Sequence, residues 1–177
     1  MDEELRAFYD DVVSKLERPG LPHITMLDEG QMVGPFTSMF NFPQYGEPLF
    51  RLQLSILKQN LVPQNTIELF ILVVACAEKA AYAIYAHELL AIDAGVPPQV
   101  VIAIKEGREP ELVSQEEKTA YALAVALSKG GVVPEAVFEE ALGYFGAEGL
   151  NVLVNTAALF KYLSTLMNAY DEPVPGV

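Results

Sequence analysis

Hydrophobic residues recur along the chain at the spacing of amphipathic and buried helices, and no segment alternates in the way that a half-buried strand does. A first amphipathic helix is predicted over residues 2–17. Further helices are predicted, in chain order, over about 46–60, 64–77, 79–94, 97–106, 114–129, 134–146 and 147–170. The pattern therefore predicts an all-α fold.

Local signals mark several helix ends. Gly95 suits the C-terminal end of one helix, and Pro97 suits the first turn of the next. Ser114 and Glu117 have the spacing of a capping box, in which each side chain accepts a backbone N–H at the start of a helix. These signals support helix boundaries that hydrophobic spacing alone leaves open.

Residues 18–43 interrupt the helical pattern. They contain Pro19, Gly20, Pro22, Gly30, Gly34, Pro35 and Pro43. An irregular segment of this length in a compact domain usually packs as a lid, an arm or a pocket wall. We therefore predict a single domain over residues 1–177 with an irregular N-terminal arm at about 18–43. His23, within this arm, is expected at the surface.

Two predicted helices are apolar on more than one face. Residues 70–77 include no polar residue, and residues 150–167 include few. Such helices must be buried by the domain itself or by a neighbouring subunit. Because a chain of 177 residues has a limited interior, we expect a homo-oligomer.

Charge and composition narrow the class of protein. The formal net charge is −13, which disfavours nucleic acid as a partner, since that binding depends on lysine and arginine. Residues 1–6 are acidic overall, whereas the start of a signal peptide is basic. The longest apolar run, 69–77, is too short to cross a bilayer. A cytoplasmic protein without a membrane span is expected.

The most specific motif lies around His87. Three residues precede it at a defined spacing, namely Glu68, Ala80 and Ala83. In one unbroken helix, Glu68 and His87 would lie about 28 Å apart, at about 1.5 Å per residue. They can meet only if the chain turns back between them, and the polar pair at 78–79 is the natural place for that turn.

This spacing resembles the Glu-x11-Cys-x2-Cys-x3-His motif of the alkylhydroperoxidase D-like branch of the carboxymuconolactone decarboxylase superfamily, with alanine at both cysteine positions. The run Tyr-Ala-Ile-Tyr-Ala-His that ends at His87 is similar to the Tyr-Glu-Trp-x-x-His run of members that also lack the cysteines. The resemblance covers about residues 20–175. It implies an alkylhydroperoxidase D-like helical bundle that assembles as a trimer or hexamer.

Alanine at both cysteine positions removes the chemistry of that motif. Peroxide reduction needs one thiolate to attack oxygen and a second thiol to resolve the product. Thiol peroxidase activity is therefore not expected. Cys76, the only cysteine, is expected to be a small buried apolar residue, with Cys76-dependent redox activity as an alternative.

His87 and Glu68 are the candidate catalytic residues. A histidine titrates near pH 6.5 and can exchange a proton at neutral pH, although a structural histidine is the alternative. Glu68 starts an otherwise apolar run, so it must be paired or protonated if buried; the alternative is a charge at a helix N-terminus. As a pair, Glu68 would orient His87 or act as the base while His87 donates.

Four further residues are candidates for substrate binding. The hydroxyls of Tyr82 and Tyr85 could bind a carboxylate or a carbonyl, or the rings could be core or interface aromatics. Asn155 and Tyr162 lie with Asn151 on a polar stripe of an apolar helix. That stripe could line a pocket or form hydrogen bonds between helices.

No zinc-ligand spacing, phosphate loop or serine nucleophile elbow occurs, so no metal and no cofactor is expected. The resemblance implies a cofactor-free acid/base enzyme, a decarboxylase, lyase or isomerase, that acts on a small organic acid or lactone. The alternative is a non-catalytic oligomeric binding or assembly protein that retains the fold. An open pocket at Glu68 and His87 would favour the enzyme, and a site filled by side chains would favour the alternative.

Overall fold

The computed structural model describes residues 3–16, 22–27 and 30–176, and their regular structure is helical apart from one antiparallel bridge between Met26 and Met32. This confirms the all-α prediction. The helices are α1 (Glu3–Leu16), α2 (Pro35–Asn41), α3 (Pro43–Leu57), α4 (Gln64–Glu78), α5 (Ala81–Asp93), α6 (Pro98–Lys105), α7 (Gln115–Lys129) and α8 (Glu135–Ala169).

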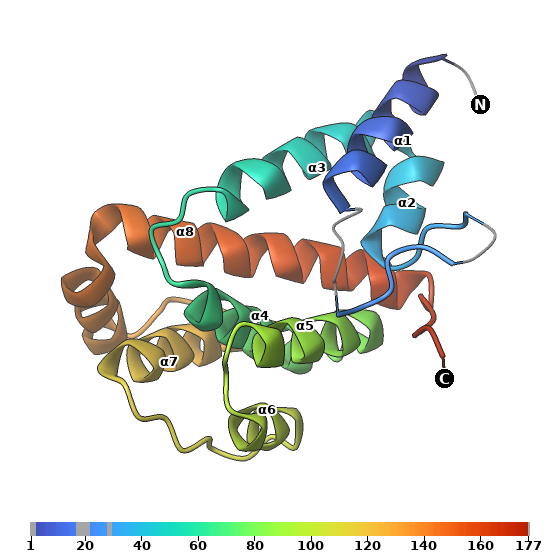
Figure 1. Ribbon diagram of the computed structural model, residues 1–177. Helices are drawn as coiled ribbons and strands as arrows, with labels where there is room; N and C mark the ends of the chain where they lie inside the picture. Colours follow the sequence, from blue (N-terminus) through green and yellow to red (C-terminus); the bar gives the residue numbers. More distant parts are fainter. Residues whose placement is uncertain (1–2, 17–21, 28–29, 177) are drawn as a thin grey trace.

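Helix α4 lies at the centre of the bundle and packs against α5, α6, α7 and α8. Every residue from Thr66 to Ala75 is buried, as the apolar run along this helix predicts. Figure 1 shows α8 crossing the middle of the molecule, with α1 and α3 on one side of it and α4 and α5 on the other. Helix α8 therefore lies between the N-terminal helices and the pair α4 and α5.

The predicted reversal between Glu68 and His87 is confirmed. Helix α4 ends at Glu78, and Lys79 has the left-handed backbone conformation, with φ of 55°. Such a residue ends a helix and allows the next one to start in a new direction. Helix α5 then packs against α4, which brings the two halves of the motif onto facing helices.

Two predicted helix ends in the second half of the chain are also confirmed. Ser114 and Glu117 form both hydrogen bonds of the capping box at the start of α7. Gly146, with φ of 67° and ψ of 175°, interrupts α8 where the sequence predicted one helix to end and the next to begin.

The prediction of an irregular segment over residues 18–43 was wrong for its C-terminal part, which forms α2. Pro35 occupies the first turn of this helix, and Phe36 and Met39 are buried. The backbone N–H of Gly34 and the hydroxyl of Thr37 donate hydrogen bonds to the Glu172 carboxylate, each at 2.8 Å. Helix α3 also begins and ends three residues before the predicted 46–60.

Parts of two predictions lie outside the described residues. These are the ends of the predicted helix over 2–17 and residues 18–21 and 28–29 of the predicted arm. Among the residues that the structure describes, no helix is both long enough and apolar enough to cross a membrane.

Candidate active site

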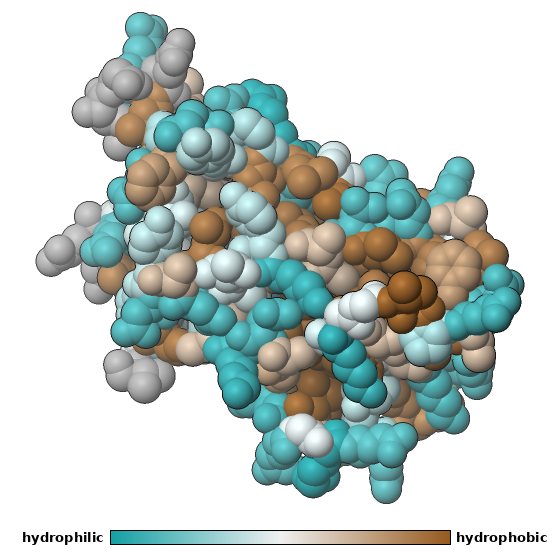
Figure 2. All heavy atoms as spheres, turned by 180° about the vertical axis from the view of Figure 1, so that it is seen from behind, coloured by the Kyte–Doolittle hydropathy of each residue, from teal (hydrophilic) through white to brown (hydrophobic). Residues whose placement is uncertain are grey.

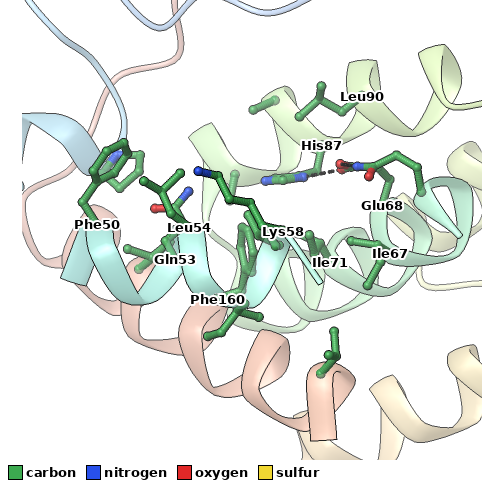
Figure 3. A pocket seen from close by; sticks show the side chains of 18 of the residues that line it. Phe50, Gln53, Leu54, Lys58, Ile67, Glu68, Ile71, His87, Leu90 and Phe160 are labelled. Atoms are coloured by element: carbon green, nitrogen blue, oxygen red, sulfur yellow. Dashed lines mark hydrogen bonds and ion pairs between the residues drawn. The ribbon is translucent and has the colours of Figure 1, made fainter. Parts of the chain in front are cut away.

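Glu68 of α4 and His87 of α5 form a direct contact, in which the His87 Nδ1 atom lies 2.7 Å from Glu68 Oε2. Figure 3 shows the two side chains approaching from their separate helices. Both are largely buried, with 14 % of the His87 side chain and 7 % of the Glu68 side chain exposed. The contact is therefore shielded from bulk water.

Both oxygens of the Glu68 carboxylate have a partner. Oε1 accepts a hydrogen bond from the Gln64 side-chain amide at 2.7 Å, and Oε2 faces His87. A buried carboxylate needs such partners to remain ionised. Because an ionised carboxylate only accepts hydrogen bonds, His87 donates its Nδ1–H, and in the neutral ring Nε2 is left as a proton acceptor.

A cavity of about 310 Å³ borders this pair. Its wall is mostly apolar and comes mainly from α3, α4, α5 and α8, with further residues from α1, the arm, α2 and the connection between α3 and α4. Figure 3 shows Phe50, Leu54, Ile71, Leu90 and Phe160 around it. The His87 ring meets Phe160 edge-on, with 4.8 Å between the ring centroids and an angle of 89° between the planes. This packing restricts rotation of the imidazole.

The charged residues along the cavity are not predominantly acidic, although the protein is. Lys15 and Lys58 line it, whereas Glu68 is the only acidic residue among the described residues of its wall. Lys15 is paired with Asp11, and Lys58 forms no ion pair with the residues that the structure describes. Figure 3 shows the Lys58 side chain among those that line the cavity. Lys58 thus supplies a positive charge at the cavity, although the protein as a whole is acidic.

Two of the predicted substrate-binding residues contact the arm. Tyr82 lines the cavity, but its hydroxyl donates a hydrogen bond to the Ile24 carbonyl at 2.7 Å. The Ile24 N–H donates to the Tyr85 hydroxyl at 3.2 Å. Burial raises the pKa of the Tyr82 hydroxyl, with smaller contributions from Tyr85 and Glu172, so this group stays protonated and remains a donor.

The other two predicted residues lie outside this cavity. The Asn155 amide donates to the Asn151 carbonyl and to the Asn151 side chain, at 2.8 and 3.0 Å. Tyr162 is exposed and lines a separate groove beside Tyr45 and Tyr170. The structure does not bring Asn155 or Tyr162 to His87, so a role for them in binding stays a prediction.

Three residues that line the cavity were not predicted from the sequence, namely His23, Gln64 and Lys58. His23 was expected at the surface, but it is half-buried and lies on the cavity wall. Burial lowers its pKa to about 4, the nearby His87 lowers it as well, and Glu68 raises it. Gln64 precedes Glu68 by four residues, a helical spacing that could have revealed it. No sequence signal pointed to His23 or Lys58.

Metal and thiol chemistry receive no support at this site. Among the described residues, no group of three or more histidine, cysteine or acidic side chains could hold a metal ion. Cys76 does not line the cavity, and burial raises the pKa of its thiol to about 11, although the charge of Lys105 lowers it. A thiol of that pKa is protonated at neutral pH and is a poor nucleophile.

No protein-family model matches the chain, and no curated protein matches it. Solved structures do match. Two are of the debrominase Bmp8, one free and one of a cysteine-to-alanine variant bound to 2,3,4-tribromopyrrole. They share 16 % and 17 % identity with this chain, each at a TM-score of 0.74, and the match covers 98 % of this chain and 87 % of theirs.

Two other similar structures are of bacterial proteins. A protein of unknown function from Agrobacterium tumefaciens, related by its description to the AhpD antioxidant defence proteins, has a TM-score of 0.72 and 15 % identity, over 79 % of this chain and 97 % of its own. An uncharacterised peroxidase-related protein from Ralstonia eutropha JMP134, with an alkylhydroperoxidase AhpD core, has a TM-score of 0.70 and 17 % identity, over 96 % and 84 %. The chain therefore has the alkylhydroperoxidase D-like fold that its motif spacing predicted.

Proposed function

We propose that this protein is a cofactor-free acid/base enzyme that acts on a small organic acid or lactone, as a decarboxylase, lyase or isomerase. The observation that carries the proposal is the Glu68–His87 pair on the wall of a cavity of about 310 Å³. A cavity of this size accommodates a small molecule, and its mostly apolar wall with few polar groups is typical of ligand sites.

The chemistry follows from the hydrogen bond to Glu68. Neutral His87 can accept a proton at Nε2, and the buried carboxylate stabilises the imidazolium that forms. In the reverse direction, the imidazolium donates that proton to a carbanion or enolate carbon. In a decarboxylation, Nε2 first takes the proton of the substrate carboxyl group. The C–C bond then breaks, its electron pair forms the enolate, CO₂ leaves, and the imidazolium returns that proton to the carbon to complete the product.

Lys58 is suited to assist this chemistry. It lines the same cavity and forms no ion pair with the described residues, so its ammonium is available to a carboxylate or an enolate oxygen. A positive charge near a developing negative charge stabilises that charge and so lowers the barrier to its formation.

The cavity favours an enzyme over a non-catalytic assembly protein, because side chains do not fill the space at His87. The debrominase Bmp8 was captured with 2,3,4-tribromopyrrole, so another protein with this fold binds a small ring. We do not extend thiol-dependent chemistry to this chain, since its only cysteine has a raised pKa and lies away from the cavity.

A thermal-shift screen tests the proposal, because a ligand that binds the folded state must stabilise it. The panel is benzoate, 2-hydroxybenzoate, pyrrole-2-carboxylate, acetoacetate and γ-butyrolactone. Wild type is compared with His87→Gln and Glu68→Gln, and Glu88→Gln on the same helix as His87 is the control, since Glu88 pairs with Lys105.

We expect at least one compound to raise the Tm of the wild type and of Glu88→Gln, and to raise it less in the two site variants. Compounds that stabilise the wild type then enter turnover assays. Equal stabilisation of wild type and His87→Gln by every binding compound would contradict the proposal, because binding would not involve the site.

A further inference from the structure

His23 brings a second imidazole to the cavity, and the proposed mechanism does not use it. This arm residue is half-buried and lines the cavity together with Glu68 and His87. The charges of both residues act on the pKa of His23, since His87 lowers it and Glu68 raises it. At neutral pH the ring is uncharged, because burial lowers its pKa to about 4, and it offers one N–H donor and one acceptor.

The backbone beside His23 is fixed by the helix that carries His87. Both polar backbone groups of Ile24 form hydrogen bonds with tyrosine hydroxyls, the carbonyl with Tyr82 and the N–H with Tyr85. These tyrosines precede His87 by five and two residues on α5. One helix therefore holds His87 and also the arm residue next to His23.

Two polar atoms on the cavity-lining residues have no partner in the described protein. The His23 Nδ1 atom and the Gln53 Oε1 atom are both buried, and neither forms a hydrogen bond with the residues that the structure describes. A buried polar group without a partner is unfavourable, and a molecule bound beside it can supply the missing hydrogen bond. Here both belong to residues around one cavity.

We propose that His23 is a second ligand-contacting residue, whose neutral imidazole exchanges a hydrogen bond with a polar group of the small molecule bound against His87. This inference rests on the proposed function, because it requires that the cavity binds a small molecule. It assigns the ligand a chemical class: a compact, largely apolar molecule with two hydrogen-bonding groups, one for each imidazole. Tyr82 and Tyr85 are positioning residues, since they act through Ile24.

Histidine side-chain NMR tests the inference directly, because the chain contains two histidines, and a His23→Asn spectrum assigns both. The full-length protein is labelled on histidine and titrated with the five compounds of the panel. A compound with two polar groups, such as 2-hydroxybenzoate, should shift the signals of both rings. His23→Asn should raise the Kd of that compound about tenfold, as expected when one hydrogen bond is lost. The Tm of the free variant should stay close to that of the free wild type.

The outcomes separate this inference from the proposed function. Shifts of both rings with weaker binding by His23→Asn support both proposals. Shifts of His87 alone, or an unchanged Kd in His23→Asn, overturn the role of His23 and leave the proposed function intact. If no compound shifts His87, both proposals are contradicted.

The positioning role of the tyrosines has its own readout. Tyr85→Phe removes the acceptor of the Ile24 N–H and should shift the free-protein signals of His23, raise the Kd about threefold, and leave the His87 signals in place. Tyr45→Phe, at an exposed tyrosine of α3, is the matched control. Unchanged His23 signals in Tyr85→Phe would show that this hydroxyl does not position the ring.

Discussion

At the scale of single residues, the Glu68 carboxylate determines which nitrogen of His87 faces the cavity. Its Oε2 atom accepts the Nδ1 proton at 2.7 Å, and its Oε1 atom is held by Gln64. A neutral imidazole carries one proton, so fixing it on Nδ1 leaves Nε2 basic. This contact makes the Nε2 atom of His87 a proton acceptor toward a ligand.

The tautomer of His87 is therefore the first prediction. In ¹⁵N spectra recorded at a pH where the ring is neutral, Nδ1 should be protonated and Nε2 unprotonated. Glu68→Ala removes the acceptor and should release this preference, whereas Glu88→Ala, one position after His87, should retain it. A wild-type ring protonated on Nε2 would contradict the assigned hydrogen bond.

Cys76 provides a second prediction at this scale. Burial raises the pKa of its thiol to about 11, so at pH 7.5 only about 0.03 % is thiolate. Alkylation by iodoacetamide, followed by intact-mass spectrometry, should be at least about 100-fold slower than for free cysteine and should accelerate about tenfold per pH unit. The protein unfolded in guanidinium is the control and should react at the ordinary rate. Rapid labelling of the folded protein at pH 7.5 would contradict burial of the thiol.

The sequence predicted the central pair of the site but not its surroundings. Glu68 and His87 were found because the motif spacing and the turn at 78–79 bring two helices together. Gln64 could have been found from its helical spacing. His23 could not, because it reaches the cavity through hydrogen bonds between Ile24 and residues about 60 positions away, which no local pattern encodes.

At the scale of helices, the segment before α2 depends on close contact between the arm and α5. Gly34 has a φ of 71°, and a Cβ atom added there would lie 2.1 Å from the Tyr82 ring. Both the positive φ and the lack of room for a Cβ atom therefore require glycine at position 34. The contact keeps Tyr82 beside the arm, where its hydroxyl holds Ile24.

Gly34→Ala should destabilise the protein by about 3 kcal/mol, the sum of left-handed backbone strain and overpacking. Gly131→Ala is the matched control, because its φ is 75° and no atom lies within 4 Å of the added Cβ. The control should lose only about 1 kcal/mol. Urea unfolding measures both free energies, and equal losses in the two variants would contradict the Tyr82 contact.

Helix prediction succeeded where the stabilising contacts are local. The capping box at Ser114 and the break at Gly146 both depend on residues within one turn, and both were predicted. Helix α2 was missed because its first turn is satisfied by the Glu172 carboxylate, 138 residues away from Gly34. Gly34 and Pro35 therefore mark the start of a helix, although the proline and glycine content of residues 18–43 predicted an irregular segment.

At the scale of the whole molecule, the protein carries a formal charge of −13, whereas the described residues of the cavity wall include two lysines and one glutamate. The acidic exterior should not attract an anion from a distance, but Lys58 provides a local positive charge at the site. Figure 2 shows one face of the molecule, on which hydrophobic side chains form groups among hydrophilic ones. Some exposed apolar side chains also gather in the groove between α2, α3 and α8.

The homo-oligomer remains a prediction, and this groove is where we expect contact between subunits. Phe42, Tyr45, Tyr162 and Tyr170 line it and are exposed. Light scattering should give three or six times the chain mass of 19.4 kDa. Tyr45→Glu should lower that mass, and Val132→Glu, at an exposed valine outside the groove, should not. A monomeric wild type would contradict the prediction.

The measurement that tests the account most directly is hydrogen–deuterium exchange of bound compounds in D₂O, followed by ¹H NMR. An enzyme that moves a proton through His87 exchanges C–H bonds next to a carbonyl, even where no net product forms. Wild type should accelerate exchange in at least one β-keto acid or lactone that binds. His87→Gln should lose about 100-fold or more of that acceleration. Equal exchange by wild type and His87→Gln, or none in a compound shown to bind at His87, would contradict acid/base catalysis at this site.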